Sequence, residues 1–233
     1  MTTRRGFLTT VGMLASGAVS AQGQQACIVF TKATQSATTP EQALARLKEG
    51  NTRFLTGRTI HCDLQAQVKD TASGQAPFAA VLGCMDSRVP PELVFDQRLG
   101  DIFAVRIAGN FVNTDIVGSL EYATKVAGAK LIVVLGHSDC GAIKGAIDDV
   151  QLGHLTSALA KIRPVVKEVT DIEGARDSKN KKFVQNVADR NAKDSAAALT
   201  MHSPVLAALV ADGRLNIVSA MHDVSTGAVS WSV

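Results

Sequence analysis

Two short segments of the chain carry residues that bind soft metal ions. The segment VLGCMDSRVPPE contains Cys84, Asp86 and Arg88, and the segment IVVLGHSDCGAIKG contains His137 and Cys140. Each begins as an apolar, β-branched run that reaches a glycine, which is typical of a buried strand followed by a turn. Two thiolates and one imidazole are a ligand set that favours Zn²⁺. If the two strands are neighbours in a parallel sheet, their carboxyl ends bring the three ligands together.

The surroundings of these ligands favour a metal site over ordinary core residues. Taken singly, Cys84 is more often a small buried hydrophobe, and an Asp-Ser-Arg turn is more often a surface ion pair. Their joint occurrence with His137 and Cys140 at two equivalent strand ends makes those interpretations poor. Cys140 also comes just before a predicted helix, whose positive end favours the thiolate form.

The fourth coordination position decides between a structural and a catalytic site. A structural site is closed by a fourth protein ligand, whereas a catalytic site keeps a place for water. Cys62 is one candidate for closing the site, but it lies outside the two strand-end turns. Asp86 is nearer, and Arg88 is suited to pair with it and hold it ionised away from the metal.

The elements that must position these residues alternate between strands and helices. Nearly continuous apolar runs predict strands at 78–82, 101–107, 130–135 and 215–220, followed by a C-terminal tail. Apolar residues at helical spacing predict helices from the Thr39–Pro40 cap to Phe54, over 115–127, 141–150, 155–169 and 181–200, and after Pro204. This alternation predicts a single α/β domain with a mainly parallel sheet flanked by helices on both faces.

The first residues predict an export signal. Residues 1–21 contain the twin arginine Arg4-Arg5, a short apolar stretch and small residues up to Ala21, and they resemble a twin-arginine export signal. The stretch is too short and too weakly apolar for a transmembrane helix. We therefore expect cleavage after Ala21, a linker over 22–38, a folded domain over 39–233, a periplasmic location, and no membrane insertion once the signal is removed.

Charge and cysteine usage narrow the function classes. The net charge is only +3, and the basic residues are scattered without interleaved aromatics, which argues against a nucleic-acid partner. A thiol redox role would use Cys-x-x-Cys, which is absent. Cys27 and Cys62 lie outside the ligand-like pattern. An oxidising destination permits them to pair, provided that the fold brings their Cα atoms within bridging distance.

At this point the motifs resemble a known family. CMDSR and HSDCG, with GQAPFAAVLG before them and DIFAVRIAGN between them, closely resemble the β-class carbonic anhydrases from about Thr39 to the C-terminus. The resemblance implies one Zn²⁺ per chain, held by Cys84, His137 and Cys140, and a catalytic dyad of Asp86 and Arg88. The implied reaction is the reversible hydration of CO2 to bicarbonate and a proton, by a zinc-bound hydroxide that the dyad orients. In a closed form, Asp86 leaves Arg88 and becomes the fourth ligand.

The resemblance also implies a substrate pocket and an assembly. Gln75 matches a glutamine that reaches across a dimer interface into the partner's pocket. Phe103 and Tyr122 match apolar pocket-lining positions, although both residues would also suit an ordinary core. Gly141 offers a backbone N–H close to the zinc. We therefore expect a homodimer or a higher homo-oligomer that binds CO2 and bicarbonate.

The sequence departs from relatives at two places. Val81 stands where allosterically controlled members have a tryptophan in a non-catalytic bicarbonate site, although Arg106 is present; we therefore predict an open active site without that inhibition. Met221-His222 stands where many relatives have aromatic residues. His222, His154 and His202 are candidates for a proton relay, although a lone histidine is usually only a surface residue.

Two other functions stay open at this point. The same fold and ligands also serve hydrolases of carbon disulfide or carbonyl sulfide, which differ mainly in access to the pocket. A zinc-stabilised binding protein without catalysis is the other alternative. The presence of both Asp86 and Arg88 argues against it, because a structural zinc site needs neither.

Overall fold

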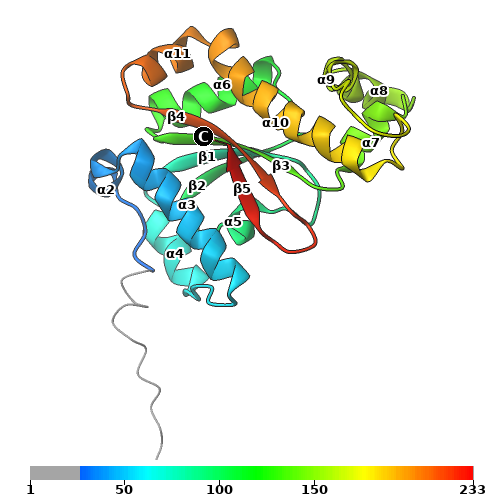
Figure 1. Ribbon diagram of the computed structural model, residues 1–233. Coiled ribbons are helices and arrows are strands. Elements are labelled where there is room, and N and C mark those ends of the chain that lie inside the picture. Colours follow the sequence, from blue (N-terminus) through cyan, green and yellow to red (C-terminus); the bar gives the residue numbers. More distant parts are fainter. Residues whose placement is uncertain (1–26, 233) are drawn as a thin grey trace, which may run out of the picture.

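The computed structural model describes residues 27–232 and contains one sheet of five strands (Figure 1). The predicted export signal and residues 22–26 lie outside the described residues. In spatial order the strands are β2 (Ile102–Arg106), β1 (Ala79–Gly83), β3 (Leu131–His137), β4 (Asn216–His222) and β5 (Val229–Ser232). The first four are parallel and β5 is antiparallel to β4, so the predicted mainly parallel sheet is confirmed. A C-terminal tail was predicted where the structure has β5; its residues alternate between half-buried and exposed, over the shortest run that predicts a strand.

Helices cover both faces of the sheet, as predicted (Figure 1). The side chains of β3 alternate between two core clusters, so Leu131 and Val133 face one helical layer while Ile132 and Val134 face the other. The first layer is α3 (Pro40–Leu55) with α5 (Pro91–Val94), and the second is α6 (Thr114–Glu121), α10 (Lys181–His202) and α11 (Pro204–Ala211). Every residue of β3 is buried, as expected for a central parallel strand.

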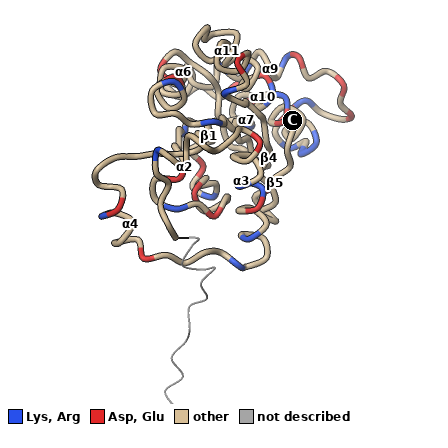
Figure 2. Tube along the Cα trace, turned by 90° about the vertical axis from the view of Figure 1, so that its left-hand side faces the viewer, with Lys and Arg blue, Asp and Glu red and all other residues tan. Residues whose placement is uncertain are grey.

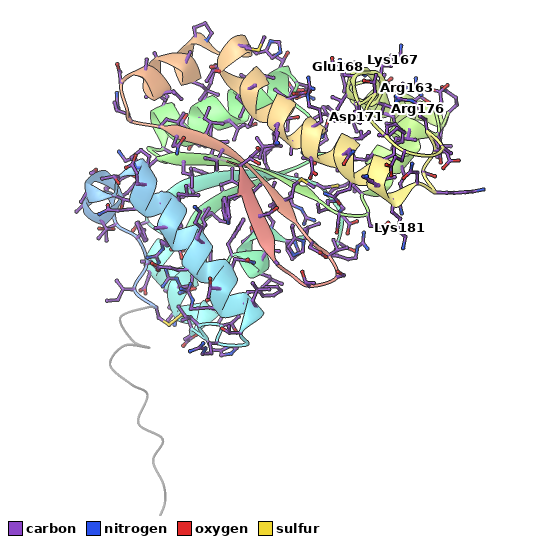
Figure 3. All side chains as sticks on the ribbon, viewed as in Figure 1. Arg163, Lys167, Glu168, Asp171, Arg176 and Lys181 are labelled. Carbon is purple, nitrogen blue, oxygen red and sulfur yellow. A yellow bond between two sulfur atoms is a disulfide. The ribbon has the colours of Figure 1, made fainter. Side chains whose placement is uncertain are left out.

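A third cluster lies beyond the carboxyl edge of the parallel strands. It contains α7 (Gly141–Ile147), α8 (Gly153–Leu159), α9 (Arg163–Glu168) and the first half of α10. Cys84 and Cys140 belong to this cluster, so the predicted metal ligands lie where the sheet meets these helices. The outer surface of α9 and the loop after it carries charged side chains of both signs, including Arg163, Glu168 and Asp171 (Figure 3).

The N-terminal segment is more structured than the predicted linker. Residues 32–37 form helix α2 (Lys32–Ala37), which begins with a capping box between Thr31 and Thr34. The buried Gln35 amide donates to the carbonyl oxygens of Pro77 and Ala127 at 2.6 and 2.9 Å. The prediction of a linker over 22–38 is therefore wrong for residues 32–37, because a single buried amide in a polar segment anchors this helix.

The remaining differences concern short helices. The predicted helix 155–169 is two helices, α8 and α9, because Pro164 lies in the first turn of the second one. The helix predicted over 115–127 is α6 followed by a π-helical turn, η1 (Tyr122–Val126). α4 (Leu64–Thr71) and α5 were not predicted. α4 lies at the periphery of the chain (Figure 2). Acidic and basic residues are interspersed along the whole trace in the same view.

Helix α3 fastens the first layer to the end of the sheet. The Asn51 amide donates to the carbonyl oxygens of Val94 and Gly227, both at 3.0 Å, and its oxygen accepts from the Val229 backbone N–H at 3.1 Å. This buried side chain therefore connects α3 with α5 and with the β4–β5 hairpin.

Among the described helices, none is long and apolar enough by itself to cross a membrane; α10 and α11 together pass that test but are bent by 97°.

Candidate metal centre

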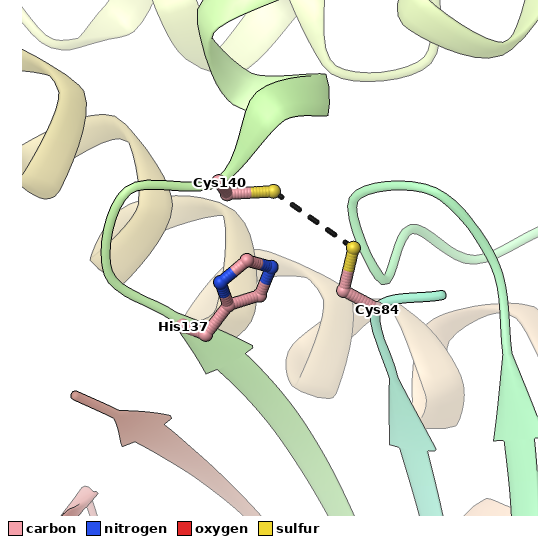
Figure 4. Close-up of side chains that lie close together, drawn as sticks. All are labelled: Cys84, His137 and Cys140. Atoms are coloured by element: carbon pink, nitrogen blue, oxygen red, sulfur yellow. Dashed lines mark hydrogen bonds between the residues drawn. The ribbon is translucent and has the colours of Figure 1, made fainter. Parts of the chain in front are cut away.

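The three predicted ligands converge on one buried point. Cys84 directly follows β1, His137 is the last residue of the neighbouring β3, and Cys140 is the N-cap of α7. Their ligand atoms all lie within 4.8 Å of one another, and the two sulfur atoms are 3.9 Å apart (Figure 4). The ligands come from adjacent parallel strands, so the prediction from the two strand-end motifs is confirmed.

The imidazole of His137 is oriented for a metal ion. Its Nδ1 is 2.9 Å from the carbonyl oxygen of Ser138, so Nδ1 carries the proton and donates. Nε2 is buried and has no hydrogen-bond partner among residues 27–232. A buried polar atom without a partner is costly, and a metal ion between this nitrogen and the two sulfurs would satisfy it. The residues therefore fit Zn²⁺.

The electrostatics of the two cysteines also fit a cation. Hydrogen bonding from Cys140 lowers the pKa of Cys84, and the hydrogen bond from the Gly109 N–H, at 3.3 Å from the sulfur, acts in the same direction. The same pairing, together with burial, raises the pKa of Cys140. A divalent cation bound here would take the place of the thiol protons, because cysteine binds metals as the thiolate.

Asp86 and Arg88 form a two-pronged ion pair beside these ligands. Arg88 Nε donates to Asp86 Oδ1 at 2.9 Å, and Arg88 Nη2 donates to Asp86 Oδ2 at 2.7 Å. The hydrogen bonds from Arg88 hold the pKa of Asp86 well below its usual range. Asp86 Oδ2 is 3.9 Å from His137 Nε2, so an ionised carboxylate lies at the rim of the metal position while it is bound to the arginine. Asp86 is thus paired with Arg88 in this structure, and the open active site without bicarbonate inhibition stays a prediction.

The loop from Cys84 to Asp86 is held by a residue whose role sequence reasoning missed. Arg106, at the end of β2, donates to the Cys84 carbonyl oxygen at 2.9 Å and to the Asp86 carbonyl oxygen. Its guanidinium is therefore engaged with the backbone of the site. Val81, which stands where some relatives have a tryptophan, is fully buried within β1. An arginine at the end of an otherwise apolar strand was the available signal.

Gly109 is a second support that the sequence did not single out. Its φ of +80° suits glycine, and a Cβ there would lie 2.4 Å from Ile162 Cδ1. Its N–H donates to Cys84 Sγ, and its carbonyl oxygen accepts from the buried Asn191 amide at 2.8 Å. The Ala-Gly-Asn sequence after a strand indicates such a turn, but the contact with Cys84 depends on the fold.

Asp139 gives Arg88 a second carboxylate. It lies between the two ligands of the HSDC turn, with φ of +58°, and its side chain contacts Lys144 Nζ. Asp139 Oδ2 is also 3.7 Å from Arg88 Nη1. Charges of alternating sign therefore run from Lys144 through Asp139 and Arg88 to Asp86.

The expected substrate residues are divided between three places. Gly141 is the first residue of α7, next to Cys140. Gln75 is exposed and precedes β1, so it lies at the amino end of the strand whose carboxyl end carries Cys84. Phe103 and Tyr122 pack edge to face, with ring centroids 6.3 Å apart, and line a cavity of about 630 Å³. The described residues that line this cavity include no metal ligand.

The candidate relay histidines and Cys62 are also placed. His222 is buried at the end of β4, in register with His137, and neither ring nitrogen has a hydrogen-bond partner in the described part of the chain. Burial lowers the pKa of His222. His154 and His202 are exposed. Cys62 is bonded to Cys27, with Cα atoms 5.6 Å apart, so the pairing is confirmed and Cys62 is excluded as a fourth ligand.

The fold and the site together define an α/β protein with a Cys–His–Cys metal centre at the carboxyl edge of its parallel strands. The sequence model of the carbonic anhydrase family matches residues 79–229, a range that includes this centre. The chain is 38% identical over 193 residues to carbonic anhydrase 2 of Mycobacterium tuberculosis, covering 82% of this chain and 91% of that protein. It is 35% identical over 191 residues to the carbonic anhydrase of Mycolicibacterium smegmatis, covering 82% and 92%.

Solved structures agree with these relatives. A tetrameric β-carbonic anhydrase from Sordaria macrospora is 28% identical, with a TM-score of 0.61 over 72% of this chain and 87% of that one. The β-carbonic anhydrase CafA of Aspergillus fumigatus is 27% identical, with a TM-score of 0.62 over 82% and 89%. The chain belongs to the carbonic anhydrase family, in its β class.

Proposed function

We propose that the protein catalyses the reversible hydration of CO2 to bicarbonate and a proton with one Zn²⁺ bound by Cys84, His137 and Cys140. One observation carries the proposal. The buried, unpartnered Nε2 of His137 faces two thiols, and the carboxylate of Asp86 lies 3.9 Å from that nitrogen. Three soft ligands with a carboxylate at the rim fit a metal that keeps one position for water.

The chain's own residues then have distinct tasks. When bound, Zn²⁺ supplies Lewis acidity, which makes water nucleophilic near neutral pH. Asp86, kept ionised by Arg88, accepts a hydrogen bond from the reacting water and directs the oxygen lone pair at CO2. Arg88 also keeps Asp86 away from the metal, so the position for water stays free. The Gly141 N–H, at the start of α7, is close to the same position.

The proposed enzyme is a homo-oligomer whose sites are completed across an interface. Gln75 lies at the far end of β1 from Cys84, and Phe103 and Tyr122 line a separate cavity. These three residues therefore serve a substrate pocket only if they belong to a neighbouring copy. The Sordaria macrospora relative of similar fold is described as tetrameric, which supports this assembly. Light scattering on the purified protein tests it.

The proposed location is the periplasm, reached by the twin-arginine route. The disulfide between Cys27 and Cys62 supports an oxidising destination, because such bonds are rare in the reducing cytosol. Fractionation of cells that express the full chain, with a twin lysine in place of Arg4-Arg5 as the control, tests the route. Retention of the wild-type protein in the cytosol would contradict it.

Stopped-flow CO2 hydration by the zinc-loaded protein at mildly alkaline pH tests the activity. Asp86→Asn is the matched variant, because it keeps the size of the side chain and removes its charge. We expect fast hydration that collapses in the variant while the zinc content stays at one per chain. A wild-type protein with one bound zinc and no hydration would overturn the proposal, and carbon disulfide and carbonyl sulfide would then be the next substrates to test.

A further inference from the structure

Ser138 makes three hydrogen bonds at the point where the metal-binding turn meets the end of the sheet. Its carbonyl oxygen accepts from His137 Nδ1 at 2.9 Å. Its backbone N–H donates to the His222 carbonyl oxygen at 2.9 Å. Its hydroxyl oxygen accepts from the Val224 N–H at 3.0 Å. One residue therefore connects the ring of a metal ligand to the end of β4 and to the turn after it.

The turn that receives Ser138 is itself fixed to the body of the protein. In the β4–β5 hairpin, the Gly227 N–H donates to the Asp223 carbonyl oxygen at 2.7 Å. The Asn51 side chain of α3 then bonds both Gly227 and Val229. A continuous set of hydrogen bonds therefore runs from α3, through the hairpin and Ser138, to the imidazole of His137.

Local chain geometry does not account for the Ser138 hydroxyl. A serine before a helix usually accepts from the helix's first N–H groups. Here the N-cap of α7 is Cys140, and the Ser138 hydroxyl bonds instead to the turn after β4, more than eighty positions distant in sequence. The bond is a long-range tie between the metal-binding turn and the hairpin.

We propose that Ser138 is a positioning residue for the metal centre, which holds the His137 ring with Nε2 aimed between the two cysteine sulfurs. This inference rests on the proposed metal site. Partners of the second nitrogen of a metal-binding histidine fix its tautomer and its orientation, and their loss typically weakens metal affinity 10–100-fold. In Ser138→Ala the carbonyl partner remains but loses its anchor on Val224, so we expect the lower end of that range, about tenfold.

The experiment measures metal binding, with no catalytic readout. Metal-free protein is titrated with Co²⁺, whose visible absorption reports the geometry of thiolate and imidazole ligands, and the Zn²⁺ affinity is measured by competition with a chelator. Ser138→Ala is expected to bind Zn²⁺ about tenfold more weakly, with altered cobalt bands. Ser138→Thr keeps the hydroxyl and is expected to restore both.

Ser225→Ala is the matched control, because it also removes a hydroxyl hydrogen bond from the hairpin, to Asp223, without contacting the metal-binding turn. It should leave affinity and spectrum unchanged. Equal affinities and identical spectra for wild type and Ser138→Ala would overturn the inference. A wild-type protein that binds neither metal would instead overturn the metal site, so the two failures are distinguishable.

Discussion

The metal centre and the cavity of Phe103 and Tyr122 differ in how far one chain completes them. The metal ligands Cys84, His137 and Cys140 are at most 5% exposed and are surrounded by hydrogen bonds from their own chain. Tyr122 is 49% exposed, and the nearby edge strand β2 is only half buried. The first region is finished within the chain, whereas the second presents aromatic side chains to a surface.

In the homo-oligomer that we propose, the first region depends on one chain and the second on a neighbouring copy. Metal binding needs three atoms held to within tenths of an ångström, and adjacent parallel strands supply that rigidity. A pocket for CO2 needs only apolar walls and a hydrogen-bond donor, which another copy is able to supply. Helix α4 also presents apolar side chains to the surface of the chain, because Leu64 and Val68 are 58% and 50% exposed.

Removing one ligand of the metal centre is expected to have the largest effect on metal content and on activity. Cys140→Ser replaces a soft thiolate by a hydroxyl that binds Zn²⁺ poorly. We expect loss of the bound metal and hydration at the buffer rate. The apolar core of the sheet is untouched, so the circular dichroism spectrum should remain that of the wild type. Zinc analysis and stopped flow on the same samples check this, and full activity without metal would refute the role of the centre.

Removing the disulfide acts on a region of the chain away from the metal centre. The Cys27–Cys62 bond closes a loop with a sequence separation of 35, for which chain entropy predicts about 4 kcal/mol of stabilisation. We expect Cys27→Ser/Cys62→Ser to lower the free energy of unfolding by up to this amount and to leave metal affinity unchanged. Urea denaturation of oxidised and reduced wild type provides the matched comparison. A loss of metal affinity in the variant would show that the two regions are coupled.

Gln75 tests directly whether a neighbouring copy completes the substrate pocket. We expect Gln75→Ala to reduce hydration about 100-fold, by analogy with the loss of one hydrogen-bond donor at a reacting group, and to keep the metal. Two inactive chains, Gln75→Ala and Asp86→Asn, are then coexpressed. In a mixed dimer, one site combines an intact Asp86 with an intact Gln75 from the neighbour.

If half of the dimers are mixed and one of their two sites works, about a quarter of wild-type activity returns. The control is coexpression of Cys140→Ser with Asp86→Asn, because both of these changes disable residues of the same chain's metal centre. In that mixture each metal centre of a mixed dimer carries one defect, so no site is restored and its activity gives the background. Activity of the Gln75→Ala mixture that stays at this background, with mixed dimers present, would place Gln75 in the site of its own chain.

The sequence allowed the metal centre to be predicted because its residues belong to local motifs. Cys84 and His137 each end an apolar strand, and parallel pairing alone brings strand ends together. The supports of the centre are non-local. Gly109 donates to Cys84 from a later turn, and Asn191 of α10 donates to Gly109; no pattern around either residue indicates these contacts.

Helix α2 and strand β5 show the same limit in the fold. α2 consists of six mostly polar residues and depends on one buried amide, that of Gln35. β5 depends on β4 for its ladder and on Asn51 for its first N–H. The six mostly polar residues of α2 give no apolar period, so pattern reading favours a loop there, whereas β5 alternates over only four residues, the shortest run that predicts a strand.

The smallest expected effect concerns the ion pair of Asp86 with Arg88, which lies at the rim of the metal centre. Arg88 lowers the pKa of Asp86, so the pair contributes stability fully above the ordinary aspartate pKa, about 3.9, and loses it as the pH falls further. In metal-free protein, the stability difference between wild type and Asp86→Asn should be constant from about pH 8 to 5 and shrink below about pH 4. Because the Arg88 side chain is 47% exposed, we expect less than about 1 kcal/mol.

Urea denaturation at several pH values measures this difference, and an Arg88→Gln background is its control. Without the guanidinium the carboxylate loses its ion pair but keeps the backbone N–H of residue 88, at 2.9 Å from Oδ1, so the pH-dependent part of the difference should shrink. If it persists unchanged, another group lowers the pKa of Asp86. The proposed division of labour, in which Arg88 keeps Asp86 ionised and off the metal, would then be wrong even if the metal ligands are right.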